Sequence, residues 1–290
     1  MRHIKIGSRA SLLAKRQAEI IMQKLREHYP EDQFEIVTFS TAGDRYQGAL
    51  QSQGGKGLFV KELDRALYEG RIDLAVHSLK DMPLEQPPAL PILAYSQRED
   101  PRDALILKQG ITEENLIYDG GLIGTASPRR MLQLKQLYPR CSFALIRGNV
   151  QTRLQRLEKE NFSATILAAA GLIRLEQTQV MYRLFSTEEM ITAAGQGILA
   201  VQGREGEWDL QFLNDRKAQI AAQAERSFVR AAGGSCSSPI AAYAWHEGET
   251  LWLRALYAEL GGQGMVKGEL QGKPDEAEAM GIQLARALKG

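Results

Sequence analysis

The sequence has few of the features that mark exported, disulfide-bonded, metal-binding or membrane proteins. Its 290 residues include two cysteines, Cys141 and Cys236, and four scattered histidines, so no disulfide framework or metal-ligand motif is expected. The longest apolar run, residues 164–173, has ten residues and is too short to cross a bilayer. The segment that begins at Met1 lacks the apolar stretch of a signal peptide. We therefore expect a cytoplasmic protein that uses no metal and does not enter a membrane.

Acidic residues are missing from one long segment, Gly120 to Leu157, which we call the basic window. It contains six arginines and one lysine but no Asp or Glu. The whole chain has 36 basic and 35 acidic residues, so the remainder sums to 29 − 35 = −6 and the charge is unevenly distributed. Arginine suits two-point hydrogen bonding to carboxylate or phosphate better than lysine does. The basic window therefore predicts a binding site for a small, oxygen-rich anion.

Two other interpretations of the basic window stay open. A run of positive charge is often only a solvated face. Nucleic acid is a further alternative, but the window has only Tyr138 and Phe143 as aromatics and the pI is near 7.8, so no nucleic-acid partner is expected. Against a plain solvated face, Ser127 with Pro128, and Asn149, predict two helix N-termini directly after short strands. Helix N-termini with adjacent arginines favour an anion site.

Strand-like and helix-like segments alternate along the chain, which is typical of a mostly parallel sheet covered by helices. In the first unit we predict strands over 3–7, 34–39, 72–77, 92–96 and 198–202, the last returning to the first sheet, and helices over 12–25 and 58–68. A second unit repeats the pattern, with strands near 105, 123, 166 and over 143–146. A helix over 218–230, strands over 240–246, 251–260 and 265–270, and a helix over 275–288 predict a smaller α+β domain.

The predicted organisation is therefore α/β with three domains. Residues 1–97 with 198–216 form the first lobe, 98–197 the second lobe, and 217–290 the C-terminal domain. Two lobes joined by crossing segments are expected to hold a ligand in the cleft between them.

Polar residues follow the buried strand that ends near His77. Lys80 and Asp81 would project from the carboxyl edge of the sheet, where open α/β folds bind ligands, although such a pair is ordinarily a solvated turn. Cys236 lies in a small-residue loop after a helix, with no His–Asp pair beside it. It is better suited to act as a nucleophile or attachment point than as part of a protease-like triad.

Eight segments in order resemble the porphobilinogen deaminases, also called hydroxymethylbilane synthases. They are GSR at 7–9 with Ser11 and Gln17, GGKGLFVK at 54–61, AVHSLKD at 75–81, EDPRD at 99–103, GTASPRR at 124–130, RGNVQTR at 147–153, AAGQG at 193–197 and the loop around Cys236. The resemblance spans essentially the whole chain. It implies condensation of four porphobilinogen molecules, with release of ammonia, into hydroxymethylbilane on a covalent dipyrromethane cofactor. It also implies two lobes like those of periplasmic binding proteins, a third small domain, and a role in haem-type tetrapyrrole biosynthesis.

The same resemblance implies roles for individual residues. Asp81 matches the catalytic aspartate, and Cys236 matches the thioether attachment point of the cofactor. Cofactor-binding positions are matched by Ser78, Lys80, Asp81, Thr125, Ser127, Arg129, Arg130 and Gly171. Substrate-binding positions are matched by Arg9, Ser11, Gln17, Arg147, Arg153 and Arg174. Because each porphobilinogen carries two carboxylates, the arginines would supply the counter-charges. A monomer is expected.

Some positions depart from the family pattern. Ala126 replaces a second serine, which removes one hydroxyl contact, and Ser235 replaces a glycine before the cysteine. The chain stops at Gly290, earlier than many relatives. A pure polycarboxylate-binding protein is the rival hypothesis. It would need the arginines but not Asp81, Cys236 or the third domain.

Overall fold

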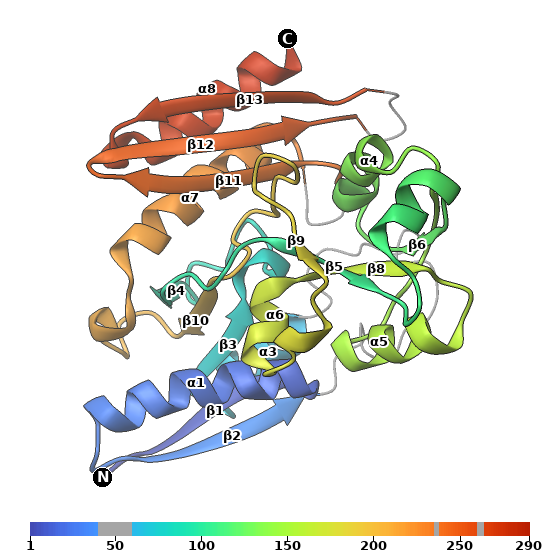
Figure 1. The fold of residues 1–290 in the computed structure, drawn as a ribbon. Helices are drawn as coiled ribbons and strands as arrows, with labels where there is room; N and C mark the ends of the chain where they lie inside the picture. Colours follow the sequence, from blue (N-terminus) through green and yellow to red (C-terminus); the bar gives the residue numbers. More distant parts are fainter. Residues whose placement is uncertain (40–59, 235–237, 260–263) are drawn as a thin grey trace. The chain divides into compact units, whose positions relative to one another are not determined.

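The computed structural model describes residues 1–39, 60–234, 238–259 and 264–290 (Figure 1). The chain divides into two compact units. Unit 1 comprises Met1–Arg98 and Ile198–Gln219, and unit 2 comprises Glu99–Gly197 and Ile220–Gly290. The assignment of 98–197 and 217–290 to separate domains stays a prediction, because unit 2 contains nearly all of both.

Unit 1 is built on a five-stranded sheet with the order β2-β1-β3-β10-β4. The strands are β1 (His3–Arg9), β2 (Gln33–Phe39), β3 (Leu74–Ser78), β4 (Ile92–Tyr95) and β10 (Leu199–Gly203). β1 runs parallel to β2 and β3, whereas β10 runs antiparallel to β3 and β4. The predicted return of the chain to the first sheet is confirmed. The sheet is mixed but mostly parallel, as predicted: β2, β1, β3 and β4 share one direction, and β10 runs against them because the returning strand enters from the opposite end.

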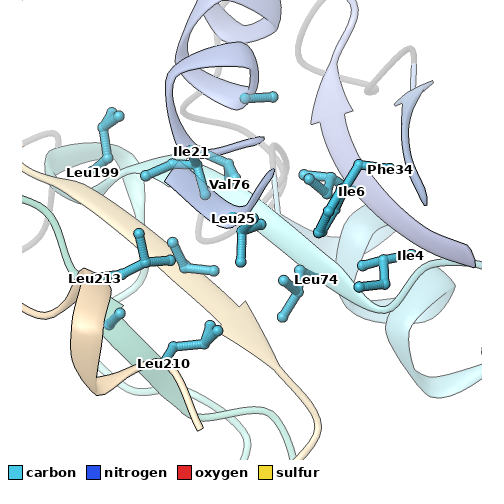
Figure 2. Close-up of a cluster of buried hydrophobic side chains, with 13 residues drawn as sticks. Ile4, Ile6, Ile21, Leu25, Phe34, Leu74, Val76, Leu199, Leu210 and Leu213 are labelled. Carbon is cyan, nitrogen blue, oxygen red and sulfur yellow. The ribbon is translucent and has the colours of Figure 1, made fainter. Parts of the chain in front are cut away.

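Two helices cover the faces of this sheet. α1 (Leu12–His28) places Ile21 and Leu25 against Ile6, Leu74 and other apolar strand residues (Figure 2). α3 (Lys61–Tyr68) covers the other face, where Leu63 and Leu67 pack near Ala75. The side chains of β3 alternate between these two cores, as strand geometry requires. α1 extends one turn beyond the predicted end at 25, and the predicted start of α3 at 58 lies outside the described residues.

Unit 2 begins with a second five-stranded sheet, of order β7-β6-β8-β5-β9. Its strands are β5 (Asp103–Leu107), β6 (Leu122–Gly124), β7 (Ser142–Ala144), β8 (Ala164–Ala168) and β9 (Arg183–Leu184), and its helices are α4 (Pro128–Leu137), α5 (Val150–Lys159) and α6 (Ala169–Arg174). β6 is parallel to β7 and β8, but β5 is antiparallel to β8 and β9. This sheet is also mixed, and the two-residue β9 was not predicted.

The C-terminal part of unit 2 is a three-stranded antiparallel sheet with helices. Its elements are α7 (Arg216–Ala231), of which residues 220–231 belong to unit 2, β11 (Ala241–Glu247), β12 (Thr250–Tyr257), β13 (Val266–Gly272) and α8 (Ala277–Lys289). α8 packs on β12 and β13 (Figure 1). The predicted class, with two α/β sheets and a small α+β C-terminal part, is therefore confirmed. The predicted end of the second strand at 260 lies outside the described residues.

Short helical turns complete the described elements. They are η1 (Leu79–Asp81), η2 (Asn115–Asp119), η3 (Thr178–Val180), η4 (Gln211–Leu213) and η5 (Pro274–Glu276). The turn that bears on function is η1, because it directly follows β3 at the edge of the unit 1 sheet.

Candidate functional site

A pocket in unit 1 lies at the carboxyl ends of β1 and β3. These strands are parallel neighbours, so their carboxyl ends meet at one edge of the sheet. The pocket has a cavity volume of about 70 Å³ and opens to solvent, and its polar lining consists of Arg9, Ser11, Gln17, His77, Ser78 and Asp81. Five of these six residues belong to the predicted site. The structure thus brings together residues from the first strand, the first helix and the third strand.

Two of the lining residues also hold the local fold together. The hydroxyl of Ser11 accepts a hydrogen bond from the backbone N–H of Ala14 at 3.3 Å and so caps α1. The buried amide of Gln17 donates to the Ser78 hydroxyl at 2.9 Å, which ties α1 to the end of β3. Asp81, by contrast, is exposed on η1 at the pocket. Its carboxylate is therefore accessible to a ligand, with Lys80 half-buried beside it on the same turn.

His77 is a pocket residue to which the sequence reasoning assigned no role. Its Nε2 lies 3.1 Å from Oε1 of Gln202, whose Nε2 donates to the carbonyl of Leu90 at 2.9 Å. Because a carbonyl only accepts, the Gln202 oxygen must face the histidine, and Nε2 of His77 carries the proton. Burial lowers the pKa of His77 to about 4, so the ring is neutral at pH 7. The sequence feature that could have indicated a role for His77 is its position at the end of a buried strand.

The N-terminus of α4 in unit 2 gathers four further predicted residues. Ser127 caps the helix, with its hydroxyl accepting from the backbone N–H of Arg130 at 3.4 Å, and Pro128 occupies the first turn. The hydroxyl of Thr125 accepts from the backbone N–H of Ser127 at 3.2 Å. Arg129 then follows on the first turn of the helix. The local prediction from the Ser-Pro pair is confirmed.

Arg129 and Arg130 are buried, with 4% and 6% of their surface exposed, and both contact Asp103. The Arg129 Nη1 atom lies 2.8 Å from Oδ2 of Asp103, and the Arg130 Nη2 atom lies 2.7 Å from Oδ1. Burial alone would raise the pKa of the Asp103 carboxyl, but the charges of the two guanidinium groups outweigh it and hold the pKa well below its usual range. Burial also lowers the pKa of Arg129, which the charge of Asp103 opposes. Asp103 lies outside the basic window, and its role was missed.

A second arginine pair lies at the start of α5. Asn149 caps this helix by accepting from the N–H of Thr152 at 2.9 Å, and Arg153 donates through Nε to the carbonyl of Gly148 at 2.8 Å. Gly148 has φ 111°, and a Cβ there would lie 2.6 Å from Cγ2 of Thr152, so glycine is required. Arg147 is half-buried just before this turn. The turn therefore holds Arg147 and Arg153 at one helix end.

The remaining predicted residues lie on α6 or outside the described chain. Gly171 is buried in α6, and Arg174 at its end donates to the carbonyl of Gly197 at 2.6 Å. Burial lowers the pKa of Arg174 to about 10, an effect that the charge of Glu99 opposes. Cys236, Ser235 and the segment 54–59 lie outside the described residues. All of these roles stay predictions.

Across residues 1–39, 60–234, 238–259 and 264–290, no group of three or more His, Cys, Asp or Glu side chains is arranged to hold a metal ion. Among those same residues, no helix is both long and apolar enough to span a bilayer.

Comparisons with known proteins identify the family. Residues 4–211 match the model described as porphobilinogen deaminase, dipyromethane cofactor binding domain, and residues 219–290 match porphobilinogen deaminase, C-terminal domain. The porphobilinogen deaminase of Ruminiclostridium josui is 47% identical over 292 residues, covering 100% of this chain and 98% of the relative. That of Acetivibrio thermocellus is 45% identical, covering 99% and 98%.

Two solved structures match part of the chain at low similarity. The methionine binding protein MetQ has a TM-score of 0.45 at 14% identity, covering 77% of this chain and 91% of MetQ. The VFT2 domain of Bordetella pertussis BvgS has a TM-score of 0.42 at 14% identity, covering 73% and 85%. The two matching family models and the full-length relatives show that the chain belongs to the porphobilinogen deaminase family.

Proposed function

We propose that this chain condenses four porphobilinogen molecules head to tail, with release of ammonia, into the linear tetrapyrrole hydroxymethylbilane. The observation that carries the proposal is the family match over residues 4–211 and 219–290. The unit 1 pocket supports it, because an exposed carboxylate and an arginine, Asp81 and Arg9, line the same hollow. Porphobilinogen is a small molecule with two carboxylates and a basic aminomethyl group. The arginine and the carboxylate of the pocket therefore each have an oppositely charged group to bind.

Asp81 is the catalytic carboxylate in this proposal. Loss of ammonia from porphobilinogen leaves a methylene-pyrrole cation, and a fixed carboxylate stabilises charge that the ground state lacks. At ~4 Å and an effective dielectric constant of ~20 the attraction amounts to about 4 kcal/mol. That energy corresponds to roughly three decades of rate. The same carboxylate is able to accept a hydrogen bond from the pyrrole N–H and to take up the ring-carbon proton that coupling releases.

The dipyrromethane cofactor fits the donors of unit 2. Within the described residues, Nε and Nη2 of the buried Arg129 donate to no protein acceptor, so three N–H donors are left for a carboxylate. When bound, the cofactor supplies the primer that the substrate units extend. Cys236 would carry it through a thioether. Its polar contacts would come from Ser78, Lys80, Asp81, Thr125, Ser127, Arg129 and Arg130, with Gly171 allowing close approach.

Substrate carboxylates would be bound by the remaining predicted residues. These are Arg9, Ser11, Gln17, Arg147, Arg153 and Arg174. Ser11 and Gln17 already hold α1 in place, so their contribution is to keep the pocket in shape as much as to contact the ligand. We also assign the chain to the cytoplasm as a monomer, an assignment that its two cysteines are consistent with.

Intact mass and product formation test this function together. The purified parent is expected to weigh more than its sequence by two condensed pyrrole units, and the Cys236→Ser variant is expected to show the bare sequence mass. The parent should also consume porphobilinogen and release a linear tetrapyrrole. A parent that stays at its bare mass after incubation with porphobilinogen, and yields no product, would support the polycarboxylate-binding protein instead.

A further inference from the structure

One buried carboxylate of unit 2 collects four hydrogen bonds from three side chains. Asp103, the first residue of β5, is fully buried. Its Oδ1 accepts from Nε of Arg130 at 3.1 Å, from Nη2 of Arg130 at 2.7 Å and from Nε2 of Gln196 at 2.9 Å. Its Oδ2 accepts from Nη1 of Arg129 at 2.8 Å. These bonds engage both carboxylate oxygens, three at Oδ1 and one at Oδ2, and full burial leaves Asp103 without exposed surface for a ligand.

The two arginines use their donors differently. Arg130 gives a third bond, from Nη1 to the carbonyl of Ile166 at 2.9 Å, so each nitrogen of its guanidinium is anchored to the protein. Arg129 gives both of its bonds from Nη1, to Asp103 and to the carbonyl of Ile191, each at 2.8 Å. The Nε–Nη2 edge of Arg129 bonds to no acceptor among the described residues. That edge has the two-point geometry that suits a carboxylate.

The charges in this cluster favour an anion once Asp103 is in place. Two guanidinium groups and one carboxylate leave a net charge of +1 in a site that excludes most water. Without Asp103 the two cations would repel each other and lack compensation for burial, which is strongly unfavourable. Asp103 thus permits two arginines to be buried side by side while one positive charge remains for a ligand.

Gln196 connects this cluster to α7 and β11, the described elements that flank Cys236 in the sequence. The Gln196 amide also donates to the carbonyl of Pro101 at 2.6 Å. The neighbouring N–H of Gly195 donates to Oε2 of Glu225 on α7 at 2.6 Å, and Oε1 of Glu225 accepts from the N–H of Ala244 on β11 at 2.8 Å. The buried Glu225 carboxylate therefore links α7 and β11 to the Gly195–Gln196 turn. The orientation of the arginines is fixed relative to both elements.

We infer that Asp103 is a positioning residue for ligand binding in unit 2, which fixes the two guanidinium groups of α4 and presents the Nε–Nη2 edge of Arg129 to a carboxylate of the pyrrole chain. The inference rests on the proposed function, because it takes the ligand to be a pyrrole carboxylate. It adds a residue that touches no ligand itself and acts through Arg129. It also accounts for a buried acid next to the basic window.

The test compares Asp103→Asn with Asp100→Asn. The first variant keeps the shape of the side chain but removes its charge and turns an amide toward the guanidinium donors. The second removes an equivalent carboxylate three residues earlier, where Asp100 pairs only with the partly exposed Arg102. Three quantities are measured for the full chain: the fraction that carries the two-pyrrole mass, KM and kcat of the loaded fraction, and the melting temperature.

We expect Asp103→Asn to lower the loaded fraction and raise KM by about tenfold to a hundredfold, the range for a lost hydrogen bond to a charged group, with kcat within about twofold of the parent. Asp100→Asn should match the parent in all three. A loaded fraction and a KM equal to the parent's would overturn the inference, and so would equal losses in both variants.

A second variant and the loading of the parent distinguish a failure to fold from a failure of the proposed function. If Asp103→Asn does not fold, Gln196→Met decides, because it removes one donor to Asp103 and leaves both ion pairs. The inference then requires a severalfold higher KM at unchanged kcat, and a KM equal to the parent's overturns it. If the parent itself carries no pyrrole mass and forms no product, the proposed function fails. A loaded, active parent matched by its Asp103→Asn variant overturns this inference alone.

Discussion

At the residue scale, Asp81 is expected to affect chemistry without affecting the fold. It is exposed and follows β3 on a short turn, so its removal leaves no cavity. Asp81→Ala should lower turnover by roughly a thousandfold, as the loss of about 4 kcal/mol of transition-state stabilisation implies. The melting temperature should not change. Glu19→Ala removes an exposed carboxylate on α1 and serves as the control. Near-parental product formation by Asp81→Ala would refute the assignment.

His77 gives a second residue-scale prediction, which concerns stability and pH. Burial lowers its pKa from 6.5 to about 4, so between these pH values the unfolded chain binds more protons than the folded chain. The contribution of the neutral ring to the free energy of unfolding is therefore complete above pH 6.5. It is lost as the pH falls toward 4, by up to about 3 kcal/mol. Urea unfolding of the parent and of His77→Gln across this range measures the difference. Parallel pH profiles for the two proteins would rule out this coupling.

At the element scale, the contact between α7 and α8 depends on Gly281. A Cβ at this position would lie 1.9 Å from Oγ of Ser227 and 2.5 Å from the carbonyl oxygen of Ala224. Gly281→Ala should therefore destabilise the protein by about 1–3 kcal/mol through overpacking. At an uncrowded helical site the same change would stabilise by about 1 kcal/mol. The reverse change, Ala279→Gly, at the exposed Ala279 of α8 serves as the reference for such an uncrowded site. A Gly281→Ala variant that melts above the parent would contradict the close packing.

At the scale of the whole molecule, charge is concentrated in the basic window while the net charge is only +1. Attraction between arginines and a polycarboxylate is screened over about 10 Å at 0.1 M salt. We therefore expect kcat/KM to fall severalfold from low to high ionic strength, mainly through KM. Arg147→Ala should lower kcat/KM or the loaded fraction and flatten this salt dependence, because it removes one counter-charge at the start of α5. A salt profile identical to that of the parent would count against a role for Arg147.

Local features of the chain were predictable because the residues that produce them are adjacent in sequence. Ser127 caps α4 as its position indicated, α5 begins directly after Asn149 as predicted, and Asp81 lies at the strand edge where a polar residue after a buried strand is expected. The family resemblance was also carried by short ordered segments. These predictions need only a few neighbouring residues, over which backbone preferences and hydrogen bonds are decided locally.

The sequence by itself thus determined the α/β class, the starts of α1, α4 and α5, and the family, and it predicted an anionic ligand. Only the tertiary structure decided that β10 runs antiparallel to β3, that Asp103 compensates Arg129 and Arg130, and that His77 is kept neutral beside Gln202. His77 and Gln202 are 125 positions apart, and Asp103 is 26 and 27 positions from its arginines. No local pattern encodes such pairs, because they form only when the sheet order brings distant strands together and removes the water between their side chains.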